Sequence, residues 1–237
     1  MIFYYIRHGD PIYNPDSLTP LGIEQAEALS KRLKVYGLDE IYSSTSNRAK
    51  MTAAPTCEAL GLEPKLLDFA NENYAWRDLT IVREQGRRWL LQEKDIKNLF
   101  ASKEIRDLGD LWYNHPEFKD YNYEEGIKRI YDEADAYFRS LGYEHIRYTG
   151  KYKVIKPNDK RVALFAHHGF GIAFLSCMLD IPYPAFGTHF NLSHSGMTVI
   201  EFKEIDGYAI PQILTLSSDS HLYKEGIPTF YNNRLYF

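Results

Sequence analysis

IFYYIRHG, residues 2–9, is an apolar, β-branched and aromatic run that ends in an arginine, a histidine and a glycine. A short run of this kind, closed by glycine, predicts a buried β-strand. Arg7 and His8 then stand at the carboxyl end of that strand, and the ligands of open α/β sheets gather at this edge. We therefore expect the chemistry of the protein there.

The composition of the 237-residue chain fits one large globular domain. Lys and Arg number 28 against 32 Asp and Glu, so the net charge is −4 and we expect no nucleic-acid partner. The two cysteines, Cys57 and Cys177, are too few and too far apart for a zinc cluster or a disulfide scaffold. Since the chain has neither a signal-peptide pattern nor an apolar run of about 18 residues, we expect no membrane contact and a cytoplasmic location.

Strands and helices alternate in the first 61 residues. Thr19 is a suitable N-cap, Pro20 suits the first helical position, and Gly61 is a suitable left-handed residue at a helix end. The pattern after the first strand predicts a loop, a helix, a strand and a second helix, over residues 11–20, 20–36, 38–44 and 45–60. This alternation predicts a parallel sheet with right-handed crossovers.

The remainder of the chain predicts an insertion and then a return to the sheet. We expect one domain over residues 1–237, with a mostly helical insertion at about 83–155 whose many tyrosines pack in its core. The pattern after the insertion predicts a buried strand, an apolar helix and two closing strands, over residues 161–166, 172–179, 197–202 and 209–216.

Two predicted strands end in histidine. The first runs into Arg7 and His8, and the strand at 161–166 runs into His167 and His168. Neighbouring parallel strands bring such ends together, and Arg48, in the first turn of a predicted helix, can point across the same edge. A guanidinium group can bind two phosphate oxygens at once, in a bidentate contact, and a helix N-terminus adds backbone N–H donors. This cluster therefore suits a dianion such as phosphate.

The arrangement resembles the histidine phosphatase superfamily, also described as phosphoglycerate mutase-like, and specifically its small phosphatase branch. The resemblance rests on Arg-His-Gly at residues 7–9, LTPLGIEQA at 18–26, IYSSTSNRAKMTA at 41–53, and the pattern of residues 162–179. It implies a three-layer α/β/α sandwich with a mostly parallel central sheet and a helical cap insertion.

The resemblance implies that His8 is a nucleophile that forms a phosphohistidine. Arg7, Arg48 and a protonated second histidine would neutralise the phosphate. Aligning the strand at 161–166 and the helix after it with the family's pattern favours His167 as that second histidine, with His168 as the alternative. If His167 has this role, His168 is expected to line the pocket.

Three further site residues follow from the same resemblance. Asn14 and Gly9 are expected to bind the substrate. Glu72 is the expected proton donor to the leaving group, with Asp68 and Asp78 as alternatives.

Other polar residues have more ordinary interpretations. We expect His189, His194 and His221 to be structural hydrogen-bonding residues or pocket walls. The segment 87–89 is expected to be a solvated helix face with Trp89 packed inward, rather than the substrate end of the pocket.

The function that we expect is hydrolysis of a small phosphorylated metabolite through a phosphohistidine, with neither a metal nor a cofactor required. The partners are then a phosphomonoester and phosphate, and the oligomeric state stays open. One alternative is a cofactor-dependent phosphoglycerate mutase, an isomerase, although the extended mutase motifs are missing from the first loop and the middle segment. The other is a non-catalytic protein that binds a phosphorylated ligand.

Overall fold

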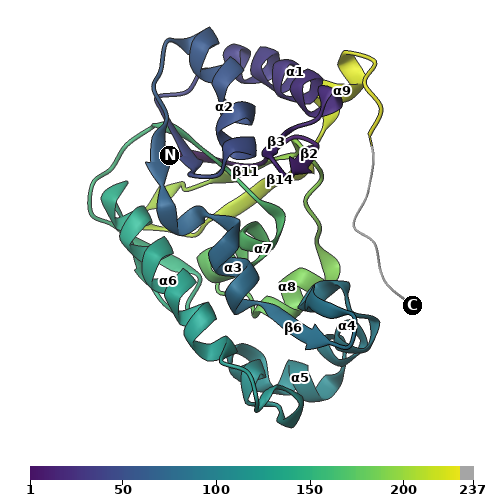
Figure 1. Ribbon diagram of the computed structural model, residues 1–237. Helices are drawn as coiled ribbons and strands as arrows, with labels where there is room; N and C mark the ends of the chain where they lie inside the picture. The colour runs from purple at the N-terminus through teal and green to yellow at the C-terminus, as the bar shows by residue number, and fades with distance from the viewer. Residues whose placement is uncertain (230–237) are drawn as a thin grey trace.

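A six-stranded sheet forms the centre of the protein, and the computed structural model describes residues 1–229 (Figure 1). In spatial order its strands are β14 (Gln212–Ser218), β11 (Met197–Glu201), β1 (Ile2–Arg7), β10 (Arg161–Ala166), β4 (Glu40–Ser44) and β5 (Lys65–Leu67). β1 runs parallel to β10, β10 to β4 and β4 to β5, whereas β11 and β14 are antiparallel. The predicted α/β fold class with a mostly parallel sheet is confirmed.

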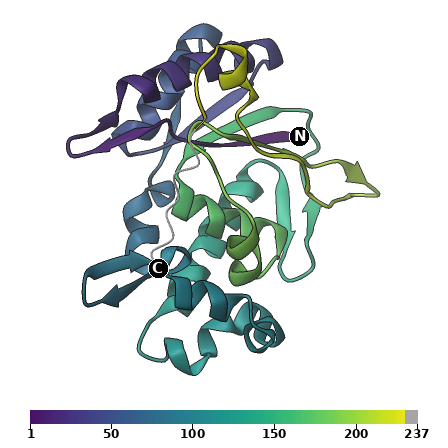
Figure 2. The same ribbon diagram turned by 90° about the vertical axis from the view of Figure 1, so that its right-hand side faces the viewer.

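Helices cover both faces of the sheet because its central strands are apolar on both sides. In the described residues the α-helices are α1 (Pro20–Tyr36), α2 (Asn47–Leu60), α3 (Glu72–Asp78), α4 (Lys94–Phe100), α5 (Lys103–Leu108), α6 (Tyr123–Ser140), α7 (His168–Leu179), α8 (Tyr183–His189) and α9 (Ser220–Lys224). Along β1, Tyr4 and Ile6 pack with residues of α1 and α2, and Phe3 and Tyr5 pack with residues of α6 and α7. Figure 2 shows the sheet between the purple and blue helices on one side and the green and teal helices on the other.

The ends of the first two helices follow their sequence signals. The Oγ1 of Thr19 accepts the backbone N–H of Gly22, and Pro20 is the first residue of α1. Gly61 ends α2 in the left-handed conformation, with φ 65° and ψ 34°. The helix after β10 starts at His168, four residues earlier than expected, because its first turn contains Gly169 and Gly171, and glycine is a poor helix former that gives no helical signal.

The insertion is helical with additional short strands. Between α3 and β10 the structure places, with η for a 3₁₀-helix, β6 (Thr80–Arg83), β7 (Gly86–Trp89), η2 (Leu90–Gln92), α4, α5, η3 (Gly109–Asn114), η4 (Pro116–Phe118), α6, β8 (Tyr143–Ile146) and β9 (Lys151–Val154). The strands β8 and β9 were not expected, because they are only four residues long and alternate with charged residues. The tyrosines pack as predicted: buried Trp112 stacks on Tyr123 and Tyr183, with ring centroids 5.4 and 5.6 Å apart.

Two predicted segments are divided differently in the structure. The expected loop after β1 contains a small hairpin, β2 (Pro11–Tyr13) and β3 (Asp16–Leu18). The expected strand at 209–216 is split at Pro211, which lacks a backbone N–H, into β13 (Tyr208–Ala209) and β14. β13 pairs with β9 and with β12 (Glu204–Ile205), so the insertion is tied to the end of the sheet.

A buried charge network holds the insertion to α7. The imidazole of His145 lies between Asp135 of α6 and Asp180 at the end of α7, at Nδ1–Oδ1 2.8 Å and Nε2–Oδ2 3.1 Å, and it stacks on Tyr152. Burial lowers the pKa of His145, but the hydrogen bonds and charges of Asp135 and Asp180 outweigh it and raise this pKa to about 9.

We expect this network to make stability depend on pH. The ordinary histidine pKa is about 6.5, so the stabilisation from protonated His145 is complete below pH ~6.5 and is lost as the pH rises through ~9. The raised pKa corresponds to about 3 kcal/mol. Urea unfolding between pH 6 and 9.5 should show this loss in the wild type and not in His145→Gln. An equal pH slope in the two proteins would contradict this account, and His189→Gln, at an exposed histidine, should keep the wild-type slope.

No helix in residues 1–229 is long and apolar enough to cross a membrane.

Candidate active site

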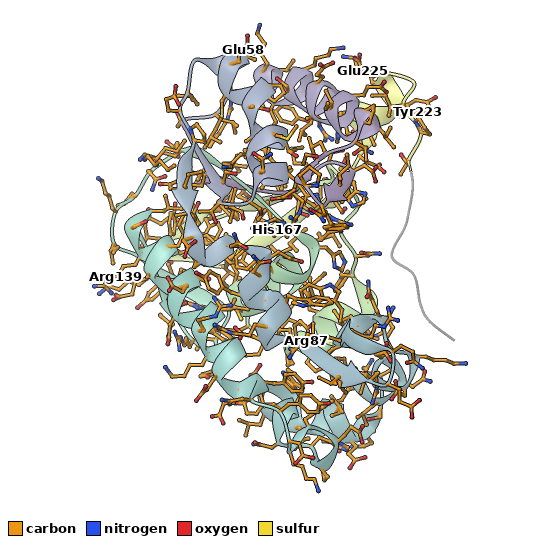
Figure 3. All side chains as sticks on the ribbon, in the orientation of Figure 1. Glu58, Arg87, Arg139, His167, Tyr223 and Glu225 are labelled. Carbon is orange, nitrogen blue, oxygen red and sulfur yellow. The ribbon has the colours of Figure 1, made fainter. Side chains whose placement is uncertain are left out.

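The carboxyl ends of three parallel strands build the site. Arg7 is the last residue of β1 and is paired in register with Ala166, the last residue of β10. His8 and His167 follow directly, and their ring centroids are 5.2 Å apart. Ser44 ends β4 on the other side of β10. Figure 3 labels His167 near the middle of the molecule, in the interior.

These ends face a cavity of about 1190 Å³. One wall comes from the sheet edge, the β2–β3 hairpin and the start of α2, and the other from α3, the β7–η2 segment, α4 and α8. Figure 1 shows α2 above and α4 with α8 below, so the insertion supplies part of the second wall, through the β7–η2 segment and α4, together with α3 and α8. Of the predicted residues, the cavity is lined by Arg7, His8, Arg48, Glu72 and His168.

The imidazole of His8 is held in one tautomer. Its Nδ1 lies 2.7 Å from the carbonyl oxygen of Gly9, and because a carbonyl only accepts, Nδ1 carries the proton. Burial is the main cause that holds the pKa of His8 well below its ordinary value, and the neighbouring His167 ring and the charge of Arg7 act in the same direction, because each disfavours a second positive charge beside it. The ring is therefore neutral, and its lone pair is on Nε2.

Arg7 is buried and donates hydrogen bonds to two residues, one of which, His194, contacts a third residue, Asp10. Its guanidinium donates to the carbonyl of Leu192 at 2.6 Å and to Nε2 of His194 at 2.5 Å, and Nδ1 of His194 lies 3.4 Å from a carboxylate oxygen of Asp10. Burial lowers the pKa of Arg7 to about 10, so it stays charged at neutral pH. Burial and the charge of Arg7 lower the pKa of His194 to about 2, which keeps His194 neutral and able to accept from Arg7.

Arg48, in the first turn of α2, binds a carboxylate that the sequence did not point to. Its Nη1 donates to Asp16 at 2.8 Å, and the other oxygen of Asp16 accepts the backbone N–H of Asn47 at 2.7 Å. The helix start and the arginine thus already bind an anionic group from the β2–β3 hairpin, which is the behaviour that phosphate binding needs.

Glu72, the first residue of α3, lies against the N-terminus of α7. Its two carboxylate oxygens accept the backbone N–H groups of Gly169 and Phe170 at 2.9 and 3.2 Å. Burial raises the pKa of Glu72, against the effect of these hydrogen bonds and of Arg48 and Arg7, so the protonated form persists to higher pH. The alternatives do not line the cavity: Asp68 binds Tyr74, and Asp78 pairs with Arg77 and Arg129.

The two candidate second histidines occupy different positions. His167 is fully buried, with Nε2 2.7 and 2.8 Å from the hydroxyls of Ser44 and Ser46. His168 lies on the cavity wall, with Nε2 2.7 Å from Oδ1 of Asn191. Burial and the charges of Arg48 and Arg7 hold the pKa of His167 well below its ordinary value, so the expected protonated His167 is neutral in the free site.

Three buried nitrogens of this site have no hydrogen-bond partner in the described residues: Nε of Arg7, Nε of Arg48 and Nδ1 of His167. Buried polar atoms are nearly always paired, so orphans gathered on three residues of one site indicate that a ligand completes it. An anion is the ligand that the two guanidinium groups favour.

Two predicted substrate-binding residues are not brought to the cavity. Asn14 is exposed in the turn between β2 and β3 and does not line the cavity. The N–H of Gly9 donates to Thr52 at 3.0 Å, and a Cβ at Gly9 would lie 2.7 Å from the carbonyl oxygen of Gly22. The structure thus gives Gly9 a close-packing role against α1.

Sequence reasoning undervalued three wall residues. His194 was expected to be a wall or hydrogen-bonding residue, and it supports Arg7 directly. Trp89 is not on a helix: it ends β7, lines the cavity and meets Trp76 edge-to-face at 5.0 Å. Asp16 carried no signal, because a single aspartate in a proline-rich loop looks like turn composition.

Residues 3–110 match the family described as the histidine phosphatase superfamily (branch 1). Curated relatives named "Probable phosphoglycerate mutase GpmB", from Yersinia pestis and Yersinia pseudotuberculosis, are 29% identical over 122 residues, which cover 45% of this chain and 57% of theirs. The chain thus spans little more than half the length of these relatives.

Solved structures of similar fold cover most of the chain. Phosphoserine phosphatase from Entamoeba histolytica in complex with 3-phosphoglyceric acid has a TM-score of 0.60 at 18% identity, over 93% of this chain and 98% of that one. Alpha-ribazole phosphatase from Shigella flexneri has a TM-score of 0.58 at 17% identity, over 92% and 97%. At these identities the likeness concerns the fold.

Within residues 1–229, no group of three or more histidine, cysteine, aspartate or glutamate side chains is placed to hold a metal ion.

We expect His194→Ala to weaken anion binding, because Arg7 then loses the hydrogen bond to Nε2 of His194 and keeps the one to the Leu192 carbonyl. A hydrogen bond from a charged group contributes about 1.5–3 kcal/mol, so the Kd of orthovanadate, measured by calorimetry, should rise about tenfold or more. His115→Ala removes a histidine that does not line the cavity and should leave the Kd unchanged. Equal Kd values for wild type and His194→Ala would contradict the supporting role of His194.

Proposed function

We propose that this chain is a phosphomonoesterase of the histidine phosphatase superfamily, which passes the phosphoryl group of a small phosphorylated metabolite to His8 and then to water. The match of residues 3–110 to that family supports the proposal. One observation carries the proposal: the Gly9 carbonyl fixes the proton of His8 on Nδ1, so that Nε2 is an unprotonated nucleophile beside two arginines.

The first half-reaction begins with attack of Nε2 of His8 on phosphorus. An N–P bond forms, the P–O bond of the ester breaks, and the proton of Glu72 goes to the leaving oxygen. The Gly9 carbonyl keeps the Nδ1–H of His8 throughout and thus stabilises the positive ring of the phosphohistidine. In the second half-reaction Glu72, now a carboxylate, takes a proton from the attacking water, and the N–P electron pair returns to Nε2.

The remaining residues stabilise charge on the phosphoryl oxygens. Arg7 and Arg48 supply two positive charges, and each such preorganised donor typically contributes about 10²–10³ in rate. Neutral His167 supplies a third donor: when the serine hydroxyls at 2.7 and 2.8 Å donate to its Nε2, the proton is on Nδ1, the nitrogen without a partner in the described residues. His168 is proposed to contact the substrate from the cavity wall.

A mutase remains the second candidate, since the curated relatives carry that name. The two activities share the phosphohistidine and differ in the acceptor, which is water in one and a hydroxyl of the substrate in the other. Incubation with 3-phosphoglycerate and a bisphosphate primer separates them, because a phosphatase releases phosphate and a mutase forms 2-phosphoglycerate. We expect phosphate release.

The free, buried thiols of Cys57 and Cys177 support a reducing compartment, and we propose the cytoplasm.

Replacing the nucleophile tests the proposal. His8→Ala should lower turnover of p-nitrophenyl phosphate about a thousandfold or more, because no other group can form the covalent intermediate. Between the second histidines, His167→Ala should lower kcat more than His168→Ala, which should mainly raise KM. If His8→Ala turned over substrate at the wild-type rate, the covalent mechanism would be refuted. If the wild-type protein bound phosphate without any turnover, and His8→Ala lost that binding, the protein would be a non-catalytic phosphate binder.

Replacing the acid tests its assignment through the leaving group. Glu72→Gln should slow hydrolysis of an alkyl phosphate about 10²–10⁴-fold and that of p-nitrophenyl phosphate far less, because nitrophenolate leaves without a proton. Since the pKa of Glu72 is raised, kcat/KM for the alkyl ester should fall as the pH rises through that value, and this fall should be absent in Glu72→Gln. Asp68→Asn is the matched control. Equal losses on both esters in Glu72→Gln would assign the acid elsewhere.

A further inference from the structure

Lys97 of α4 lies half-buried on the insertion side of the cavity. The lysine–carboxylate pairs within residues 1–229 involve Lys31, Lys65, Lys103, Lys128 and Lys160, so neither Lys97 nor Lys50, the other lysine of the cavity lining, has a carboxylate oxygen within 4.0 Å there. The charge of Lys97 reaches the cavity: burial, then Arg7, and to a smaller extent Lys97 together lower the pKa of His168 to about 3, against the hydrogen bond with Asn191. A half-buried cation without a counter-ion is costly unless a ligand supplies one.

An apolar wall lies in the same cavity. Trp76 and Trp89 meet edge-to-face at 5.0 Å, and both rings line the cavity together with Leu91. Trp76 is 37% exposed, so part of its ring is available to a ligand.

The wall begins where the leaving group departs. A Cβ at Gly169 would lie 2.4 Å from the Trp89 ring and 2.9 Å from Oε1 of Glu72, so the ring and the proposed acid meet at one point. An alcohol protonated by Glu72 therefore lies against Trp89 when its bond to phosphorus breaks.

The cavity has room for such an alcohol. Its volume of about 1190 Å³ exceeds the 300–1,000 Å³ typical of pockets for drug-sized ligands. The hydroxyl oxygen of Thr188, on the α8 part of the same wall, is buried and has no partner in the described residues, so it offers the ligand a further hydrogen bond.

We propose that the substrate is a phosphomonoester whose alcohol part carries a flat or apolar segment, bound against Trp76 and Trp89, and a second anionic group, a carboxylate or a phosphate, bound by Lys97. This inference rests on the proposed function, because it places the first phosphate at His8. Lys97 is then a specificity residue, because it binds the part of the substrate that does not react.

The test compares aryl phosphates that differ only in the second charge. The ligands are phenyl phosphate, the 3- and 4-carboxyphenyl phosphates, and the matching phenylene bisphosphates. Their Kd values are measured on His8→Ala through tryptophan fluorescence, since Trp76 and Trp89 are two of the three tryptophans, and their kcat/KM values are measured on the protein with His8 intact.

At least one doubly anionic ligand should bind about tenfold or more tightly than phenyl phosphate, as a charge-assisted contact implies. Lys97→Met should remove this preference and change the Kd of phenyl phosphate less than twofold. Lys94→Met, which removes an exposed lysine one turn away on the same helix, should keep the preference. Tighter binding of the carboxyphenyl phosphates would identify the second anionic group as a carboxylate, and tighter binding of the bisphosphates would identify it as a phosphate.

Two failures are distinguishable. Equal binding of singly and doubly anionic ligands, or equal losses for both in Lys97→Met, would overturn the inference about the substrate. Preferential binding without any turnover by the chain with His8 intact would overturn the proposed phosphatase activity and leave the recognition by Lys97 established.

Discussion

The parallel pairing of β1 with β10 is the constraint on which the site depends. Its register sets Arg7 opposite Ala166, so that His8 and His167 leave adjacent strands at the same level with rings 5.2 Å apart. The same pairing places the first turn of α7 beside them, where Glu72 binds two free N–H groups. A shift of either strand by one residue would turn every side chain to the opposite face and separate these groups.

Burial gives the site its charge distribution. The chain is acidic as a whole, yet Arg7 and Arg48 are 5% and 8% exposed at one sheet edge, and burial keeps the neighbouring histidines neutral. The result is a cationic site around an uncharged His8. Asp16 compensates Arg48 in the free chain, and an incoming phosphate dianion would compete with it for that arginine.

The sequence predicted the fold where periodicity and capping signals agreed. The strand at residues 2–7, the helix capped by Thr19 and the helix ended by Gly61 are all present, because each depends on local rules. The hairpin after β1, β8 and β9 were missed, since strands of three or four residues depend on pairing partners far away in the chain. For the site, the strand ends located His8, Arg7 and His167. The support of Arg7 by His194, the pairing of Asp16 with Arg48 and the wall formed by Trp89 arise from tertiary contacts that no local pattern records.

The Gly9 carbonyl reserves Nδ1 of His8 for a proton, and we propose that this leaves Nε2 to attack phosphorus. The most direct measurement is to quench the protein during turnover of a phosphomonoester and to locate the phosphoryl group by peptide mass spectrometry and ³¹P NMR. The account predicts one acid-labile phosphoryl group on Nε2 of His8. A phosphoryl group on Nδ1 or on another residue, or steady turnover with no phosphohistidine at any quench time, would contradict it.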